Sequence, residues 1–441
     1  MAPASPISGN SAVWTLRAHG LVPFRPHPRY PRSFMVTPGR HTDSQARLEQ
    51  LAAHASQFLE CHGPGQAPRL FFSPGRVNLF GGHLDYNGGP VMPTAIDRGT
   101  FIAARSRSDR LLRMASAYDR QVVEIDLDQL PRARVSKWVD YPLGVVLDLT
   151  TQQAESDSAL PGGLDILYGG DLPIGSGLSS SASICVGTAV MLDSLWSLGL
   201  SNLDRVRAAL RAERHFVGVQ CGIMDPYAIG CARAGHLLWL DCKDESIEYL
   251  PIDGAQLSIL VTNTGVQRAL AASEFNRRVD QCAQAFDILR SASAEATCLR
   301  DIPLEVLESE RGSMDPVLAN RAEHVIHEVR RTFEAREFLL TGNHEGMGRC
   351  MTQTHESLRS LYEVSCSELD LLVEAAANCP GAFGARLTGA GFGGCTVTLV
   401  RRGDEDEVQA SLEARFEEEF GRCPQVDVFE GDPGPREIDW A

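Results

Sequence analysis

This 441-residue sequence lacks an excess of positive charge and any long apolar run. Its 41 lysine and arginine residues stand against 57 aspartate and glutamate residues, a net charge of −16. That balance argues against a dedicated binder of nucleic acid or anionic membranes, because both need a basic surface. No run of about 18 apolar residues occurs, so no segment is predicted to span a bilayer. We therefore expect a cytoplasmic protein without nucleic-acid or membrane partners, and we expect it to be a monomer.

Paired cysteines are also missing. The 12 cysteines are scattered without a C-x-x-C pair, and most lie in apolar runs such as GGCTVTLV. This distribution excludes a recognisable zinc-binding spacing and predicts buried, reduced thiols rather than a disulfide framework.

Acidic residues are absent from the first 42 positions, which contain five arginines. This composition is typical of an organelle transit peptide. A disordered tail, or a start site assigned too far upstream with Met35 as the true start, explains it as well. We leave residues 1–42 out of the fold prediction as a disordered or mis-assigned extension.

The remaining chain has the composition of a folded protein, with 43% hydrophobic and 22% charged residues overall. Its length predicts two or three domains, and a loop before residue 257 suggests a boundary near residue 250. The mixture of strand and helix patterns predicts an α+β fold. Helices are expected at 44–60, 203–217, 280–289, 321–341, 345–361, 366–377 and 405–420, and strands at 69–73, 100–105, 121–125, 163–168, 257–263, 395–401 and 425–429.

A glycine- and serine-rich loop, GSGLSSSA at residues 175–182, lies between a predicted strand and a long apolar helix. Glycines let successive backbone N–H groups face one anion, and the N-terminus of the following helix adds further donors. Serine hydroxyls provide oxygen ligands of the kind that Mg²⁺ prefers. No lysine follows the loop, so it is not a Walker phosphate-binding loop.

Two further glycine-rich stretches carry fewer signals on their own. Residues 74–93, PGRVNLFGGHLDYNGGPVMP, are expected to form turns rather than a regular element, with Arg76, His83 and Asp85 among them. Residues 384–399, GARLTGAGFGGCTVTL, suggest backbone packed closely against a ligand or another loop, or else a bulged hairpin.

Taken in order, these segments resemble the galactokinase branch of the GHMP sugar-kinase superfamily. The resemblance extends from about Arg69 to the C-terminus and also includes the segments CGIMDP and YEVSCSELD. It implies an N-terminal domain of the ribosomal-protein-S5 type at residues 43–250 and a ferredoxin-like C-terminal domain at residues 251–441. It also implies an ATP-dependent kinase that phosphorylates the anomeric hydroxyl of a galactose-type sugar.

The resemblance assigns catalytic and cofactor roles residue by residue. Asp225, in CGIMD, matches the catalytic base, and Arg76 matches the arginine that stabilises the developing charge. Ser181 and Glu213 match the two residues that hold Mg²⁺, the implied cofactor. The implied ATP-binding loop consists of Gly175, Ser176, Gly177, Leu178, Ser179, Ser180 and Ser181.

The implied sugar site departs from the family at two positions. Its residues are Gly82, His83, Leu84, Asp85, Gly222 and Phe275. Gly82 stands where the family has a glutamate that accepts a hydrogen bond from the C6 hydroxyl of galactose, and Phe275 replaces a sugar-contacting tyrosine. Loss of the carboxylate also removes its repulsion of a C6 carboxylate, and plant galacturonate kinases are similar to this chain in having a small residue there. Galactose and galacturonate are therefore the main substrate candidates, ahead of arabinose and fucose types, and a sugar- and ATP-sensing regulator without catalysis is the alternative from another class.

Overall fold

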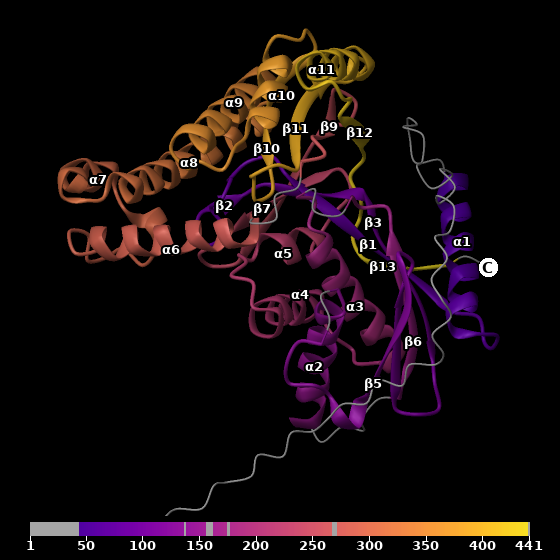
Figure 1. The fold of residues 1–441 in the computed structure, drawn as a ribbon. Helices are drawn as coiled ribbons and strands as arrows, with labels where there is room; N and C mark the ends of the chain where they lie inside the picture. The colour runs from indigo at the N-terminus through magenta and orange to yellow at the C-terminus, as the bar shows by residue number, and fades with distance from the viewer. Residues whose placement is uncertain (1–43, 136–137, 156–161, 174–176, 267–270, 440–441) are drawn as a thin grey trace, which may run out of the picture. The chain divides into compact units, whose positions relative to one another are not determined.

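The computed structural model describes residues 44–135, 138–155, 162–173, 177–266 and 271–439. The chain divides into two units, residues 1–39 and 40–441, and every described residue lies in the second. The predictions for residues 1–42 therefore fall outside the described part. The mixture of helices and sheets confirms the predicted α+β class (Figure 1).

The first half of the chain is built on a six-stranded sheet, to which the late strand β13 also belongs. Its strand order is β13-β1-β3-β6-β4-β5, and all neighbours are antiparallel except β4 and β6. The strands are β1 (Arg69–Asn78), β3 (Pro93–Ser106), β4 (Leu111–Ser116), β5 (Asp119–Asp126), β6 (Leu164–Gly170) and β13 (Arg436–Ile438). β1 continues to Asn78, so the turn structure expected from residue 74 onward was wrong for the first five residues. A bulge between Pro74 and Arg76 lets the strand pass through this glycine-containing segment.

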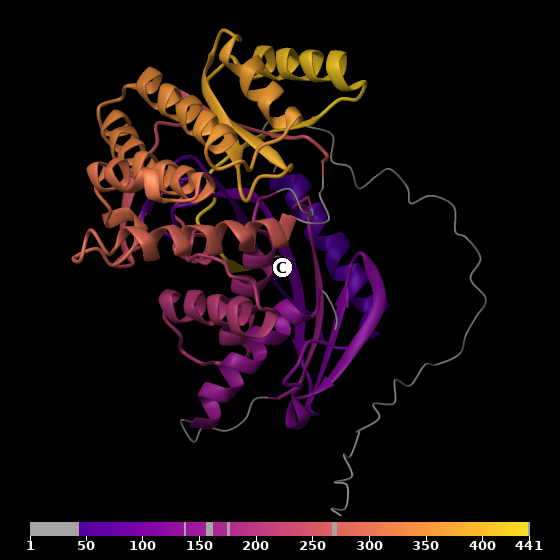
Figure 2. The ribbon, with the colours of Figure 1, turned by 60° about the vertical axis from the view of Figure 1, so that its left-hand side comes forward.

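Helices cover both faces of this sheet (Figures 1 and 2). One face packs on α3, which contacts β1 and β3, and the other packs on α1, which contacts β3 and β6. The helices of this half are α1 (Ser44–His62), α2 (Asp140–Glu155), α3 (Ser180–Trp196), α4 (Asn202–Arg211) and α5 (Met224–Gly230). The apolar core between the sheet and α2–α5 holds α3 in place. The N-terminus of α3 lies at the site described below.

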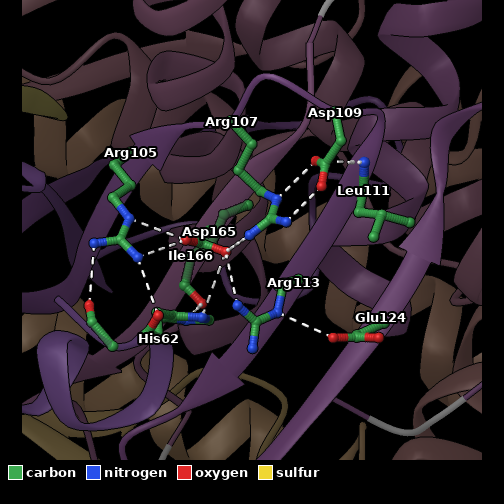
Figure 3. A network of polar contacts seen from close by, with 10 residues as sticks. His62, Arg105, Arg107, Asp109, Leu111, Arg113, Glu124, Asp165 and Ile166 are labelled. Atoms are coloured by element: carbon green, nitrogen blue, oxygen red, sulfur yellow. Dashed lines mark hydrogen bonds and ion pairs between the residues drawn. The ribbon is translucent and has the colours of Figure 1, made fainter. Parts of the chain in front are cut away.

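A polar network at Asp165 of β6 fastens α1 to the sheet (Figure 3). Arg105 donates to Asp165 at 3.0 Å and also donates to the carbonyl oxygens of His62 and Gly63, at the end of α1. Arg107 donates to the same carboxylate at 2.7 Å. The arginine therefore supplies hydrogen bonds to carbonyl groups that the helix end leaves open.

The second half is built on a four-stranded antiparallel sheet of order β10-β11-β9-β12. Its strands are β9 (Leu257–Asn263), β10 (Ala382–Thr388), β11 (Cys395–Arg401) and β12 (Gln425–Phe429). The accompanying helices are α6 (Ala271–Leu289), α7 (Leu304–Glu310), α8 (Pro316–Leu340), α9 (His344–Ser360), α10 (Ser367–Ala377) and α11 (Glu405–Phe420). Asp315 accepts from the Val317 N–H and Pro316 occupies the first turn, so α8 begins with a well-formed cap.

A small third sheet connects the halves. It consists of β2 (Pro90–Val91), β7 (His236–Asp241) and β8 (Ser246–Pro251). One apolar cluster contains Val77 and Leu237 from the first half together with Val261 and Met347 from the second. Seven of the twelve cysteines are buried, as predicted, whereas four are half-buried and Cys423 is exposed. Among the described residues, no helix is long and apolar enough to cross a membrane.

Candidate active site

The strongest polar contact between the sequence motifs joins Arg76 to Asp225. Arg76 is buried on β1 just after the bulge, and its Nε donates to Asp225 Oδ1 at 2.7 Å. Its Nη1 donates to the Gly177 carbonyl oxygen at 2.6 Å. One guanidinium thus connects a carboxylate at the start of α5 to the glycine loop before α3.

Ser179 contacts the other oxygen of the Asp225 carboxylate. It precedes the first residue of α3 in a left-handed conformation (φ 61°), and its hydroxyl donates to Asp225 Oδ2. Such a conformation is costly for a non-glycine residue and concentrates at functional sites. The Asp225 side chain is 28% exposed, so its carboxylate is held in place yet open to solvent.

Glu213 lies in the same cluster, on a turn that the sequence did not predict. The helix expected at 203–217 is interrupted: α4 ends at Arg211, and a π-helical turn spans Ala212–Val217. Such turns are frequent at functional sites. Burial raises the pKa of Glu213 to about 7, with the Asp225 charge acting in the same direction and a hydrogen bond with Ser181 opposing both.

The Ser181–Glu213 pair fits a divalent cation. Glu213 Oε2 is buried and has no hydrogen-bond partner among the described residues. A carboxylate oxygen beside a serine hydroxyl is a ligand pair suited to Mg²⁺, which takes few protein ligands and completes its shell with water and phosphate oxygens. The described residues contain no cluster of three or more histidine, cysteine or acidic side chains that would form a metal cage.

Asp85 lies in the loop between β1 and β2, residues 79–89, which is called the sugar loop below because the family resemblance places most of the sugar site there. Its carboxylate packs against Gly222. A Cβ placed on Gly222 would lie 1.7 Å from Asp85 Oδ2, so the close approach requires glycine. Burial raises the pKa of Asp85 to about 6, and the nearby Asp225 carboxylate acts in the same direction, while Arg76 opposes it. Asp85, Asp225, Glu213 and Arg76 therefore form one electrostatically coupled group.

The other residues predicted for the sugar site lie on the same loop or beside it. His83 has a left-handed backbone (φ 60°), and its Nδ1 shares a hydrogen bond of 2.8 Å with the Tyr86 hydroxyl. The Phe275 ring, on α6, lies 5.8 Å from the His83 ring. Leu84 instead directs a fully buried side chain into an apolar cluster.

The third glycine stretch packs against the loop before α3. A Cβ on Gly177 would lie 3.1 Å from the Thr388 carbonyl oxygen, and one on Gly389 would lie 2.7 Å from the Gly177 carbonyl oxygen. Close packing against another loop was one of the expectations for this stretch, and the structure confirms it. Of the predicted loop residues, Gly175 and Ser176 lie outside the described residues, while Ser180 and Ser181 begin α3.

Four residues that contact the sugar loop were not identified from the sequence. Glu328 and His324 on α8 hold the peptide of Gly82, Tyr362 contacts Tyr86, and Arg386 on β10 faces Gly82. Tyr362 lies in the segment YEVSCSELD, which marked its importance without assigning a contact. Glu328 and His324 lie in an ordinary amphipathic helix pattern, which gave no signal.

Family models and curated proteins match this chain over most of its length. A GHMP kinases N-terminal domain model matches residues 141–233, a galactokinase galactose-binding signature matches residues 56–106, and a GHMP kinases C-terminal model matches residues 335–418. The galactokinase of Bacillus subtilis (strain 168) is 36% identical over 384 residues, covering 86% of this chain and 97% of that protein. The galactokinase of Chloroflexus aggregans is 40% identical over 363 residues, covering 82% of this chain and 91% of that protein.

Solved structures agree with these matches. The galactokinase of Lactococcus lactis complexed with galactose has a TM-score of 0.83 and 32% identity, covering 88% of this chain and all of that one. A mevalonate kinase structure, with a TM-score of 0.57 and 19% identity, shares the fold alone. The predicted two-domain GHMP-kinase fold is confirmed.

Proposed function

The chain belongs to the galactokinase family of GHMP kinases, and from this premise we propose that it transfers the γ-phosphate of ATP to the anomeric hydroxyl of galactose. The observation that carries the proposal is the Asp225 carboxylate, held between Arg76 and Ser179 at the mouth of the loop that precedes α3. This is the place where a base would meet both a sugar hydroxyl and a phosphate.

Asp225 acts as the general base in this proposal. It accepts the proton of the C1 hydroxyl while the C1 oxygen forms a bond to the γ-phosphorus and the bond to the bridging oxygen of ADP breaks. Phosphoryl transfer of this kind depends on position and charge more than on strong basicity. Arg76 fixes the carboxylate and adds a positive charge beside the transferring group.

The loop residues Gly177 to Ser181 and the N-terminus of α3 would bind the ATP phosphates. α3 has 17 residues and an open first turn, which favours an anion at this end. Ser181 and Glu213 would hold Mg²⁺, as their ligand chemistry fits, and the ion would supply charge neutralisation for the phosphates when bound.

On the sugar side, Asp85 and His83 are the proposed hydroxyl-binding residues. The half-buried Asp85 carboxylate beside Gly222 is an acceptor for two hydroxyl groups, and the neutral His83 imidazole offers a further polar atom. Phe275 provides an apolar ring next to them.

Galacturonate is the second candidate substrate, and Arg386 is the observation that favours it. This guanidinium is 1% exposed, donates to the Leu79 and Leu387 carbonyl oxygens, and makes no ion pair among the described residues. A Cβ placed on Gly82 would lie 2.7 Å from its Nη2, so the guanidinium fills the space that a side chain at residue 82 would enter, where the family resemblance implies a glutamate. Burial lowers the pKa of Arg386 to about 10, and the Glu328 charge offsets this only in part. A buried cation without a direct ion pair favours an anionic ligand, such as a C6 carboxylate.

The test is a coupled ADP-release assay over galactose, galacturonate, arabinose and fucose, with Asp225→Ala as the blank. We expect ADP release with a galactose-configured sugar, and a loss of about 10²- to 10⁴-fold in the blank because the base is removed. Binding of ATP without ADP release for any sugar would support a sensing regulator instead.

Two variants separate the substrates. In Gly82→Glu the new carboxylate would pair with Arg386, so the turnover of galactose relative to galacturonate should rise. Gly82→Gln is the matched control, because it adds nearly the same volume without the charge. An equal change in the two variants would contradict the role of Arg386.

We propose a monomer in the cytoplasm with sugar and ATP as its partners, and domains at residues 43–250 and 251–441. The net charge of −16 supports the absence of nucleic-acid and membrane partners. Light scattering of the purified protein tests the oligomeric state.

A further inference from the structure

A buried carboxylate from α8 lies against the backbone of the sugar loop. Glu328 is fully buried, and its Oε1 accepts the N–H of Gly81 at 3.2 Å and the N–H of Gly82 at 3.1 Å. Gly81 has a left-handed backbone (φ 83°), so two consecutive N–H groups point to one oxygen in the manner of an anion-binding nest. The loop thus binds an anion supplied by its own chain, 246 residues away.

The other oxygen of this carboxylate is held by two side chains. Oε2 accepts from Arg331 Nε at 2.9 Å and from the Thr354 hydroxyl at 2.8 Å. Both oxygens are therefore satisfied, and the orientation of the carboxylate is fixed by α8 and α9 together. A group oriented so firmly transmits the position of α8 to the loop.

His324 lies one helical turn before Glu328 on α8 and contacts the carbonyl group of Gly82. Its Nε2 lies 3.1 Å from the Gly82 carbonyl oxygen, and its Nδ1 lies 2.8 Å from the Ser357 hydroxyl. A carbonyl oxygen only accepts, so Nε2 carries the proton and Nδ1 accepts from Ser357. Burial lowers the pKa of His324 to about 3, which keeps this neutral tautomer at working pH.

We propose that Glu328 and His324 are positioning residues for the sugar-binding loop. They fix Gly82 through its N–H and its C=O, and so set the place of His83 and Asp85, without touching the substrate themselves. The inference rests on the proposed function for its kinetic consequence. It predicts that loss of the contacts to Gly82 raises the KM for the sugar and leaves ATP binding unchanged. The loop before α3, where ATP is proposed to bind, is held by a different contact, from Arg76 to the Gly177 carbonyl oxygen.

The matched pair Glu328→Gln and Glu334→Gln tests this inference. Both residues lie on α8, and Glu334 forms an exposed pair with Arg330. We expect Glu328→Gln to raise the sugar KM by about 10- to 100-fold with the ATP KM unchanged. The neutral amide oxygen accepts the two N–H groups more weakly than the carboxylate does, and the amide NH2 group would face the donors Arg331 and Thr354. Glu334→Gln should leave both constants unchanged. Equal rises in the sugar and ATP KM values of Glu328→Gln would overturn the inference.

His324 gives a second, independent test if Glu328→Gln does not fold. His324→Gln keeps an N–H donor for the Gly82 carbonyl, whereas His324→Leu removes it. We expect the sugar KM to rise in His324→Leu and to recover largely in His324→Gln. A purely structural role would instead show as equal losses of thermal stability without this split.

Hydrogen–deuterium exchange separates failure of the inference from failure of the proposed function. The amides of Gly81 and Gly82 should exchange faster in Glu328→Gln than in the wild type, and Glu334→Gln should match the wild type. This readout needs neither sugar nor turnover. If the wild type phosphorylates no sugar, the proposed function fails while the exchange result still tests the loop contact. Unchanged exchange in Glu328→Gln would overturn the inference itself.

Discussion

At the scale of single residues, the contact between Gly222 and Asp85 is the most sensitive point of the site. A methyl group at Gly222 would lie 1.7 Å from Asp85 Oδ2 and 2.2 Å from its Cγ, so the carboxylate must move. We expect Gly222→Ala to lower kcat/KM for the sugar by at least about tenfold, because misplacing a substrate-orienting group costs that much or more. Steady-state kinetics measures the loss, and an ATP KM close to that of the wild type is the control. Wild-type kinetics would contradict the placement of Asp85.

The raised pKa of Asp85 predicts that the KM for the sugar depends on pH. Its pKa is raised from 3.8 to about 6 by burial, with the Asp225 charge acting in the same direction. As the pH falls through about 6, the carboxylate gains a proton and loses part of its capacity to accept sugar hydroxyls, so the sugar KM should rise. Asp85→Asn should show a higher KM that no longer changes over this range. The folded state binds this proton more tightly than the unfolded state does. The contribution of Asp85 to the free energy of unfolding therefore decreases as the pH rises from about 4 to about 6.

The sequence identified part of this site and not the rest, for a physical reason. The family resemblance assigned Arg76, in the glycine-rich stretch 74–93, and Asp225, in CGIMD, and the structure brings them within 2.7 Å of each other. Glu328 and Arg386 act on the loop from elements that are distant in sequence. A helix with a normal apolar pattern gives no sign that one of its carboxylates faces a backbone 246 residues earlier.

At the scale of elements, Asp165 attaches α1 to the six-stranded sheet (Figure 3). Its side chain is 2% exposed and contacts Arg105, Arg107 and Arg113. Asp165→Asn would leave these guanidinium groups without their common anion, so we expect a loss of about 3–5 kcal/mol in the free energy of unfolding. Denaturant unfolding measures it. Asp109→Asn is the control: Asp109 forms a more exposed pair with Arg107, and its loss should cost about 1 kcal/mol or less. Equal losses would contradict a special role for Asp165.

Elements with strong local patterns were predicted well. The strand at 257–263, a continuous apolar and β-branched run, has the bounds that the sequence indicated, and so does the helix at 405–420. The helix predicted over 203–217 was wrong beyond Arg211, because the π-helical turn that carries Glu213 leaves the apolar periodicity nearly unchanged. The turn predicted from residue 74 was partly wrong, because pairing with β3 carries β1 through the glycine segment.

At the scale of the whole molecule, the strand β13 (Arg436–Ile438) pairs with β1 of the first sheet. After β12 in the second half, the chain returns and β13 pairs with β1, with Phe72 opposite Arg436 and Leu70 opposite Ile438. This strand has three residues and no local signal, so the sequence did not predict it. Together with the apolar cluster shared by both halves, the returning strand makes the stability of one half depend on the other.

Deletion of residues 435–441 tests this dependence. The truncated chain loses the β13 pairing and the packing of Ile438 against the cluster beneath α1, so we expect a loss of about 2–4 kcal/mol in the free energy of unfolding. Because the halves share a core, thermal unfolding should remain one transition at a lower temperature. Glu437→Gln is the control, since it changes only exposed polar contacts, an ion pair with Arg69 and a hydrogen bond from Ser194, and should cost about 1 kcal/mol or less. Two separate transitions after truncation would show that the halves fold independently, and an unchanged midpoint would show that β13 contributes nothing to the first sheet.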